Sequence, residues 1–228
     1  MIFKSHIELK QITVIVNLKH YNNSSGSNAA NFLKPFRNLS IPSGCDVVFA
    51  LNPIDVRIAS DFPELEFVSQ HVDSVSYGAH TGQISIEALK DLGIKGSIIN
   101  HSERRLTPDK VRETIERANE LGFQITVCCE SPAEVAQFSS LQPHAIAYEP
   151  PELIGGNVSV TSARPEIIQE TSDICHSRSV RLLVGAGIKK REDFTRSLEL
   201  GADGILIASG VVLSSNPFDT LNSLIVNL

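Results

Sequence analysis

The sequence lacks the patterns that mark nucleic-acid-binding, membrane-spanning and secreted proteins. Its 20 Lys and Arg stand against 26 Asp and Glu, which gives a formal net charge of −6, and no run of basic residues occurs. This composition argues against nucleic acid or an anionic membrane as a partner. The longest apolar run near the N-terminus, Ile12 to Val16, is far too short to span a bilayer or to act as a secretory signal. A cytoplasmic protein is therefore expected.

Metal-binding and disulfide patterns are also missing. The four cysteines, Cys45, Cys128, Cys129 and Cys175, form no C-x-x-C pair, and the seven histidines form no H-E-x-x-H or H-x-H pattern. The sequence therefore predicts buried free thiols and no zinc site or disulfide framework. Because successive side chains of a strand alternate between its faces, adjacent Cys128 and Cys129 are expected to point to opposite sides of one strand.

No shift in composition and no Gly/Ser-rich linker divides the chain, so one domain over residues 1–228 is expected. Short runs rich in Val and Ile alternate with helical patterns, and these runs are apolar on both faces, as strands of a buried parallel sheet are. The predicted strands are Thr13–Asn17, Val47–Ala50, Glu66–Ser69, Ser97–Asn100, Gln124–Cys128, Ala145–Tyr148, Arg181–Val184 and Gly204–Ile207. Eight strand–helix units in a chain of this length predict an α/β protein, a (β/α)₈ barrel with a parallel eight-stranded barrel inside a ring of helices.

Several predicted helices have clear start and stop signals. Proline stands at the first helical position after Thr107, Ser131, Arg164 and Asn216, and Gly122 and Gly201 follow the ends of two helices. The alternative fold is a doubly wound sheet that binds a dinucleotide. The one turn of that type, residues 185–190, lacks the third glycine of G-x-G-x-x-G, so the dinucleotide interpretation is weak.

Polar and small residues follow five of the predicted strands. In a (β/α)₈ barrel these strand ends meet at one mouth, where the chemistry of such barrels is found. Each residue taken singly also has a structural interpretation, as a solvated charge, a cap, an ion-pair partner or a tight turn. Their coincidence at one mouth favours a functional site. The residues are Asn17 and Lys19, then His101 and Glu103, then Glu149, then Gly185–Gly187, and finally Ala208 and Ser209. Arg104 also follows the fourth strand, but for this residue the structural interpretation as an ion-pair partner is preferred.

Six short motifs occur in an order that is similar to one known family. They are NLK at 17–19, HTGQIS at 80–85, INHSERR at 99–105, YEPPELIGG at 148–156, VGAGI at 184–188 and IASG at 207–210. Together they resemble triosephosphate isomerases, in the shortened form typical of archaea, over nearly the whole chain apart from Met1–Gln11. The resemblance implies interconversion of dihydroxyacetone phosphate and glyceraldehyde 3-phosphate in glycolysis and gluconeogenesis, without a cofactor or a metal.

The resemblance implies a role for each polar residue at the strand ends. Glu149 would be the catalytic base, and a carboxylate at the end of an apolar strand suits that role because desolvation raises its proton affinity. His101 would be the electrophile, and we expect it to open a helical turn whose positive end keeps the imidazole neutral. Asn17 and Lys19 would lie near the substrate oxygens, and Glu103 would orient Lys19.

The resemblance also implies a phosphate site and a lid. Backbone N–H groups at Ile154, Gly155, Gly187, Ala208 and Ser209 would hold the phosphate, with a short helix beginning after Ala208–Ser209. Residues 150–157 would form the lid, with two prolines at its entry and a glycine pair at its exit. The family usually reads IGTG where this chain has Ile154-Gly155-Gly156-Asn157, and Asn tolerates a positive φ better than most residues.

The segment from His71 to Ile84 is too long for a plain strand–helix connection. It carries Val75 and Tyr77 among small residues, a pattern suited to docking against another surface. The resemblance places this loop in a neighbouring subunit, with Ser76 near its tip, so a homo-oligomer, either a dimer or a tetramer, is expected.

Two other functions remain compatible with the residues alone. One is a Schiff-base aldolase on the same fold, which would use Lys19 as the covalent amine. The other is a non-catalytic barrel that binds a phosphorylated ligand. The second would require loss of the base or the imidazole, whereas both Glu149 and His101 are present.

Overall fold

The chain forms a closed barrel of eight parallel strands in a computed structural model that describes residues 11–150, 164–188, 190–226 and 228. Each strand pairs with its neighbours in sequence, and β1 pairs with β8 to close the ring. The strands are β1 (Ile12–Asn17), β2 (Cys45–Leu51), β3 (Glu66–Ser69), β4 (Gly96–Ile99), β5 (Gln124–Cys129), β6 (Ala145–Tyr148), β7 (Arg181–Val184) and β8 (Gly204–Ile207). The predicted (β/α)₈ fold is therefore confirmed.

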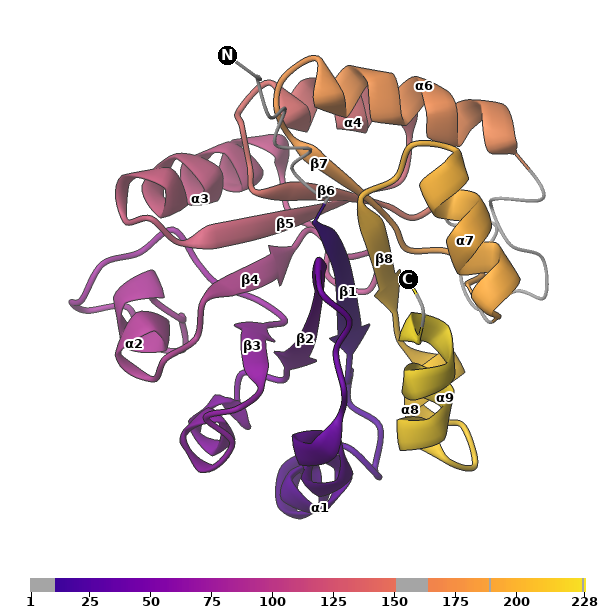
Figure 1. Cartoon of the computed structure of the whole chain (residues 1–228). Coiled ribbons are helices and arrows are strands. Elements are labelled where there is room, and N and C mark those ends of the chain that lie inside the picture. Colours follow the sequence, from indigo (N-terminus) through magenta and orange to yellow (C-terminus); the bar gives the residue numbers. More distant parts are fainter. Residues whose placement is uncertain (1–10, 151–163, 189, 227) are drawn as a thin grey trace, which may run out of the picture.

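The helices lie outside the ring of strands, and α4 and α6 run side by side on one flank (Figure 1). The α-helices are α1 (Ala29–Leu33), α2 (Ile86–Asp91), α3 (Pro108–Glu120), α4 (Pro132–Ser139), α6 (Pro165–His176), α7 (Arg191–Glu199), α8 (Ser209–Val212) and α9 (Pro217–Ile225). Three short 3₁₀ helices, η1 (Gly26–Asn28), η2 (Lys34–Asn38) and η3 (Val56–Asp61), follow β1 and β2. None of the helices in the described part of the chain is long and apolar enough to cross a membrane.

Start signals read from the sequence define three of these helices. Side chains of Thr107, Ser131 and Asn216 accept a hydrogen bond from a backbone N–H in the first turn of α3, α4 and α9. Proline follows each cap at a position where no intrahelical N–H is needed. Such a cap stabilises a helix by about 1 kcal/mol relative to alanine. Gly122, with a φ of 61°, ends α3 as predicted.

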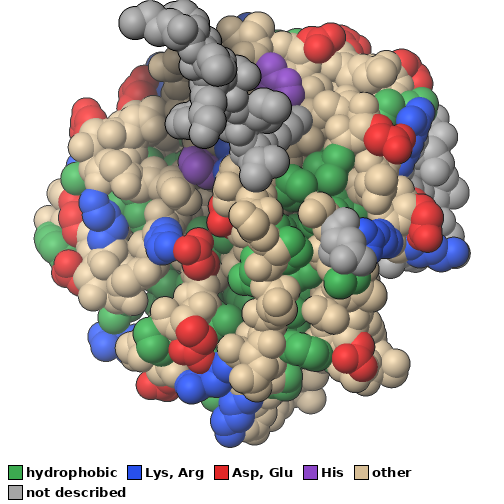
Figure 2. Space-filling view, in the orientation of Figure 1, with side chains coloured by type: hydrophobic (Ala, Val, Ile, Leu, Met, Phe, Trp, Pro, Cys, Tyr) green, Lys and Arg blue, Asp and Glu red, His purple; other side chains and the backbone are tan. Residues whose placement is uncertain are grey.

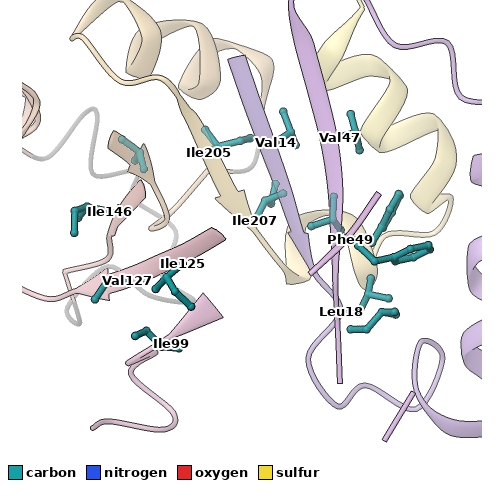
Figure 3. Close-up of a cluster of buried hydrophobic side chains, with 14 of the residues drawn as sticks. Val14, Leu18, Val47, Phe49, Ile99, Ile125, Val127, Ile146, Ile205 and Ile207 are labelled. Atoms are coloured by element: carbon teal, nitrogen blue, oxygen red, sulfur yellow. The ribbon is translucent and has the colours of Figure 1, made fainter. Parts of the chain in front are cut away.

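Alternation of side chains divides the core into two clusters. The larger cluster fills the space between strands and helices (Figure 3), and the smaller one fills the inside of the barrel. Along β1, Val14 and Val16 belong to the outer cluster and Ile15 to the inner one. Cys128 and Cys129 likewise divide between the inner and outer clusters, as predicted. All four cysteines are free and buried, which confirms the expectation of buried thiols.

Charged side chains of both signs alternate around the rim of the face shown in Figure 2, while hydrophobic side chains gather nearer its centre. No large surface of one sign is visible on this face. This distribution agrees with the absence of a basic run in the sequence.

Two details of the β4–α3 region differ from the sequence prediction. Strand β4 ends at Ile99, one residue early, because Asn100 has a φ of 60° and leaves the extended conformation. His101 is followed by hydrogen-bonded turns at residues 102–103 and not by a helix, since α3 begins only at Pro108. The expectation that His101 opens a helical turn is therefore wrong.

Candidate active site

Asn17 and Lys19 come from the end of β1. Asn17 is the last strand residue and lies two positions after Ile15 of the inner cluster, so its side chain is on the inner face of the barrel, where it is 4% exposed. The backbone then turns at Lys19, whose φ is 47°, and the Lys19 N–H donates to Asn17 Oδ1 over 3.1 Å. This turn directs the Lys19 ammonium across the mouth, where its Nζ lies 2.7 Å from Glu103 Oε1. The predicted pairing of Lys19 with Glu103 is present.

His101 lies at the end of β4 and is 8% exposed. Its Nδ1 accepts a hydrogen bond of 3.1 Å from the backbone N–H of Glu103. A ring nitrogen that accepts cannot carry the proton, so the neutral imidazole carries its proton on Nε2. That Nε2 lies 3.7 Å from Glu149 Oε2. The histidine is therefore arranged as a donor directed toward the carboxylate and the space beside it.

Glu149 directly follows β6 and is 3% exposed. Its backbone N–H donates to the carbonyl of Cys129 over 2.8 Å, which continues the pairing of β6 with β5. Its Oε2 is buried and has no hydrogen-bond partner among the described residues. Leaving a buried carboxylate oxygen without a partner is costly. Such an atom indicates a place where a ligand's hydrogen or proton is expected.

Burial controls the proton affinities of these two groups. Burial raises the pKa of Glu149 from 4.5 to about 7, against smaller opposing effects of the Cys128 thiol and the Lys19 charge. Burial also lowers the pKa of His101, and the nearby Lys19 charge adds to this effect. The neutral imidazole that the sequence analysis expected is thus supported, but the main cause is desolvation and not a helix end.

The turns after β7 and β8 lie next to each other. A side-chain carbon on Gly210, near the start of α8, would lie 3.2 Å from the carbonyl oxygen of Ile188. Gly187 has a φ of 72°, which a residue with a side chain adopts rarely. The short helix expected after Ala208–Ser209 is α8, which begins one residue earlier, at Ser209. The predicted phosphate-binding segments at Gly187 and at Ala208–Ser209 are therefore adjacent. The third predicted segment, Ile154 and Gly155, lies outside the described residues.

Two further residues near the site, Gln70 and Cys128, were not predicted from the sequence. The Gln70 side chain donates to the backbone carbonyls of Lys19 and Ala50 and so fixes the turn that carries Lys19. The Cys128 thiol is close enough to the Glu149 carboxylate to oppose the rise in its pKa. Cys128 could have been found from the alternation along β5, which places it on the inner face beside β6. Gln70 follows β3 and has no comparable signal.

Gly185 is needed for the position of Glu149. A side-chain carbon at Gly185 would lie 2.7 Å from Glu149 Oε1, closer than nonbonded atoms approach. The sequence alone suggests only that Gly185 allows a tight turn. Its more specific effect is to leave room for the carboxylate.

A buried carboxylate with a pKa of about 7 beside a neutral imidazole defines a (β/α)₈ barrel enzyme equipped for proton transfer. The model of the family described as triosephosphate isomerase matches residues 12–225. A triosephosphate isomerase of Thermoplasma volcanium is 52% identical over 215 residues, which are 93% of this chain and 99% of the relative. A triosephosphate isomerase of Saccharolobus solfataricus is 40% identical, and the aligned region is 92% of this chain and 92% of the relative. A triosephosphate isomerase of Sulfurisphaera tokodaii is 37% identical, and the aligned region is 96% of each of the two chains. The chain belongs to the triosephosphate isomerase family.

Proposed function

We propose that this chain interconverts dihydroxyacetone phosphate and glyceraldehyde 3-phosphate through an enediolate, in glycolysis and gluconeogenesis. Family membership over residues 12–225 supports the reaction. The observation that carries the assignment of residues is the buried Glu149 Oε2, which has no hydrogen-bond partner among the described residues and lies 3.7 Å from His101 Nε2.

Glu149 acts as the base. In its ionised form the carboxylate removes a proton from the carbon next to the substrate carbonyl and then returns it to the neighbouring carbon. A general base works best when its pKa lies near the working pH, and burial raises that of Glu149 to about 7. The same burial keeps water away from the carbanionic intermediate.

His101 acts as the electrophile. Its Nε2–H donates to the carbonyl oxygen, on which negative charge develops as the proton leaves carbon. The hydrogen bond from Glu103 N–H to Nδ1 fixes this tautomer before substrate binds. A neutral donor can also pass its proton between the two oxygens of the enediolate.

Lys19 and Asn17 complete the mouth. The Lys19 ammonium supplies positive charge close to the substrate oxygens, and Glu103 holds that ammonium over 2.7 Å. Gly187, Ala208 and Ser209 contribute backbone N–H groups to the phosphate. Ile154 and Gly155, and the lid from Pro150 to Asn157 to which they belong, stay a prediction because only Pro150 of that segment is described.

The reaction is tested by a coupled assay with glyceraldehyde 3-phosphate as the substrate. Conversion that follows enzyme concentration, and that a phosphorylated glycolic acid inhibits, is the expected result. Absence of turnover in folded protein would contradict the proposal. Borohydride trapping with the same substrate distinguishes the isomerase from the Schiff-base aldolase. A covalent adduct would form only if the substrate made an imine with Lys19. In the structure Lys19 Nζ lies 2.7 Å from Glu103 Oε1, so the nitrogen that an imine would use is already engaged by a carboxylate.

A homo-oligomer formed through residues 71–84 is a second part of the proposal. Tyr77 in this loop is 63% exposed, and the loop lies over a cavity of about 330 Å³ with Val75, Ser76 and Ile84 in its wall. An exposed aromatic beside an open apolar cavity is typical of an interaction surface. Light scattering should give at least twice the mass of the 24.8 kDa chain at micromolar concentration. A measured mass equal to that of one chain would contradict the proposed homo-oligomer.

The remaining parts are a cytoplasmic location and a single domain over residues 1–228. Four free, buried cysteines agree with a reducing compartment. The closed barrel uses strands from Ile12 to Ile207, which agrees with one domain. Cell fractionation and a single cooperative unfolding transition are the corresponding measurements.

A further inference from the structure

Asn100 connects strand β4 to His101 and has an unusual backbone. Its φ is 60°, a value that few residues with a side chain adopt, although Asn does so more readily than most. It is 1% exposed. Because the backbone leaves the extended conformation here, the pairing of β4 with β5 ends at Ile99 and Val127. The next carbonyl of β5, that of Cys128, therefore needs another donor.

The Asn100 side chain supplies this donor. Its Nδ2 donates to the Cys128 carbonyl over 2.9 Å, in a buried hydrogen bond that extends the pairing of the two strands by one position. Its Oδ1 accepts from the backbone N–H of Leu106 over 3.0 Å. Both ends of one buried amide are thus used, each on a different segment of the chain.

These contacts close the turn that carries the imidazole. Residues 101–105 lie between Asn100 and Leu106, so the hydrogen bond to Leu106 holds the two ends of that turn together. Arg105 adds a second closure, since its Nη1 donates to the Asn100 carbonyl over 3.2 Å. Inside this turn, Glu103 N–H donates to His101 Nδ1. The orientation of the imidazole therefore depends on a loop that Asn100 fixes at its base.

The Nδ2 end of the Asn100 amide contacts the strand segment that lies beside Glu149. Cys128, whose carbonyl accepts from Asn100, places its thiol against the Glu149 carboxylate. The backbone N–H of Glu149 donates to the carbonyl of the next residue, Cys129. One side chain thus links the turn that holds His101 to the part of β5 that contacts Glu149.

We propose that Asn100 is a positioning residue that sets His101 Nε2 against Glu149 and the substrate carbonyl. The proposal rests on the proposed function, in which these two groups perform the proton transfers. Asn100 does not contact the reacting atoms. It acts by holding the turn of residues 101–105 on β5 at a fixed distance from the carboxylate.

Two variants test the two side-chain hydrogen bonds of Asn100 separately from its backbone conformation. Asn100→Asp keeps the shape, the tolerance of a positive φ and the acceptor for Leu106, but its ionised form has no hydrogen for the Cys128 carbonyl. Asn100→Gly keeps the backbone conformation and loses both side-chain bonds. A displacement of about 1 Å in a catalytic group lowers rates by about 10²-fold, so kcat is expected to fall by roughly that factor in Asn100→Gly. The KM of either variant should change by less than about threefold, since His101 acts mainly on the developing charge.

Gln142→Gly is the matched control. Gln142 also has a positive φ, of 54°, but it is exposed and lies between α4 and β6, at the opposite end of the barrel. Its replacement tests whether relief of an unusual backbone conformation alone changes activity. Its kcat should stay within about twofold of that of the parent protein, because no catalytic group depends on it.

A further readout separates positioning from general stability. The NMR signal of the His101 Nε2–H should shift or broaden in folded Asn100→Gly. In a His101→Gln background, Asn100→Gly should lower the residual kcat by less than about threefold, because residues that act through one group are not additive.

The outcomes separate the proposed function from the positioning role of Asn100. If the parent protein does not turn over glyceraldehyde 3-phosphate, the proposed function is wrong. If the parent is active and the Asn100 variants keep its kcat and the imidazole signal, the positioning role is wrong. Full additivity with His101→Gln would also overturn it, because Asn100 would then act independently of the imidazole.

Discussion

The two mouths of the barrel carry similar side chains in different surroundings. At the carboxyl mouth, Glu149 and His101 lie beside each other with exposures of 3% and 8%. At the amino mouth, Glu66, His144 and Arg181 surround an open cavity of about 90 Å³. There the Glu66 carboxylate pairs with Lys95 over 2.5 Å, and the two side chains are 43% and 55% exposed.

The comparison teaches that residue type does not decide which mouth is chemically active. Partial burial lowers the pKa of His144 as it does that of His101, and nearby Arg181 contributes to the shift. Among the residues that the structure describes, however, a neutral histidine points at a buried carboxylate whose pKa is about 7 at the carboxyl mouth and not at the amino mouth. Reactivity arises from the pair and its exclusion from water, and the amino mouth offers matched control residues.

The strongest contrast is expected between the two glutamates. Glu149→Gln keeps the shape and removes the basicity, so kcat should fall by about 10²–10⁴-fold or more. Glu66→Gln at the other mouth should leave kcat within about twofold. Steady-state kinetics of both variants, with circular dichroism to confirm folding, make the test. If kcat of folded Glu149→Gln fell by less than tenfold, the assignment of Glu149 as the base would be wrong.

A similar pair tests the histidines. His101→Gln removes the Nε2–H donor to the developing oxyanion, and loss of one such donor lowers kcat by about 10²–10³-fold. His144→Gln should have no effect on kcat, because this residue lies at the amino mouth. Equal effects of the two substitutions on kcat would mean that the contrast between the mouths is not catalytic.

Two glycines provide a steric version of the comparison. Alanine at Gly185 would place its Cβ 2.7 Å from Glu149 Oε1 and displace the carboxylate, so kcat should fall by about 10²-fold in folded protein. Alanine at Gly204, the first residue of β8, would collide with the backbone carbonyl of Thr13. That variant should lose thermal stability while its folded fraction keeps its kcat. The opposite pattern would show that Gly185 serves folding only.

The smallest effect concerns stability against pH. The pKa of Glu149 is about 7 in the folded chain and 4.5 without burial, so the folded state binds one more proton between these pH values. The free energy of unfolding should therefore fall as the pH rises from about 4.5 to 7, by about 3 kcal/mol for this group. Urea unfolding of Glu149→Gln and the parent protein should diverge over this window, with the variant more stable above pH 7. Parallel curves would show that ionising Glu149 costs no stability.

Most of the architecture could be predicted from the sequence because it depends on local patterns. Val- and Ile-rich runs gave the eight strands to within a few residues, and Pro after Thr107, Ser131 and Asn216 marked helix starts. Glu149, His101 and Lys19 could be assigned to one mouth because a parallel barrel brings all carboxyl ends of its strands together. The boundary at Asn100 was missed by one residue, since Asn is compatible with both an extended and a left-handed backbone.

The sequence by itself determined which chemical groups are present, namely a base, an imidazole and a cation, and which strands bring them to one mouth. Only the tertiary structure decided the proton affinities of these groups and the hydrogen bonds that position them. The raised pKa of Glu149 and the lowered pKa of His101 come mainly from burial by segments distant in sequence. The amide of Asn100 meets the carbonyl of Cys128, 28 residues away, only because β4 lies beside β5. Desolvation and hydrogen bonding between distant segments are properties of the packed barrel, and no local pattern encodes them.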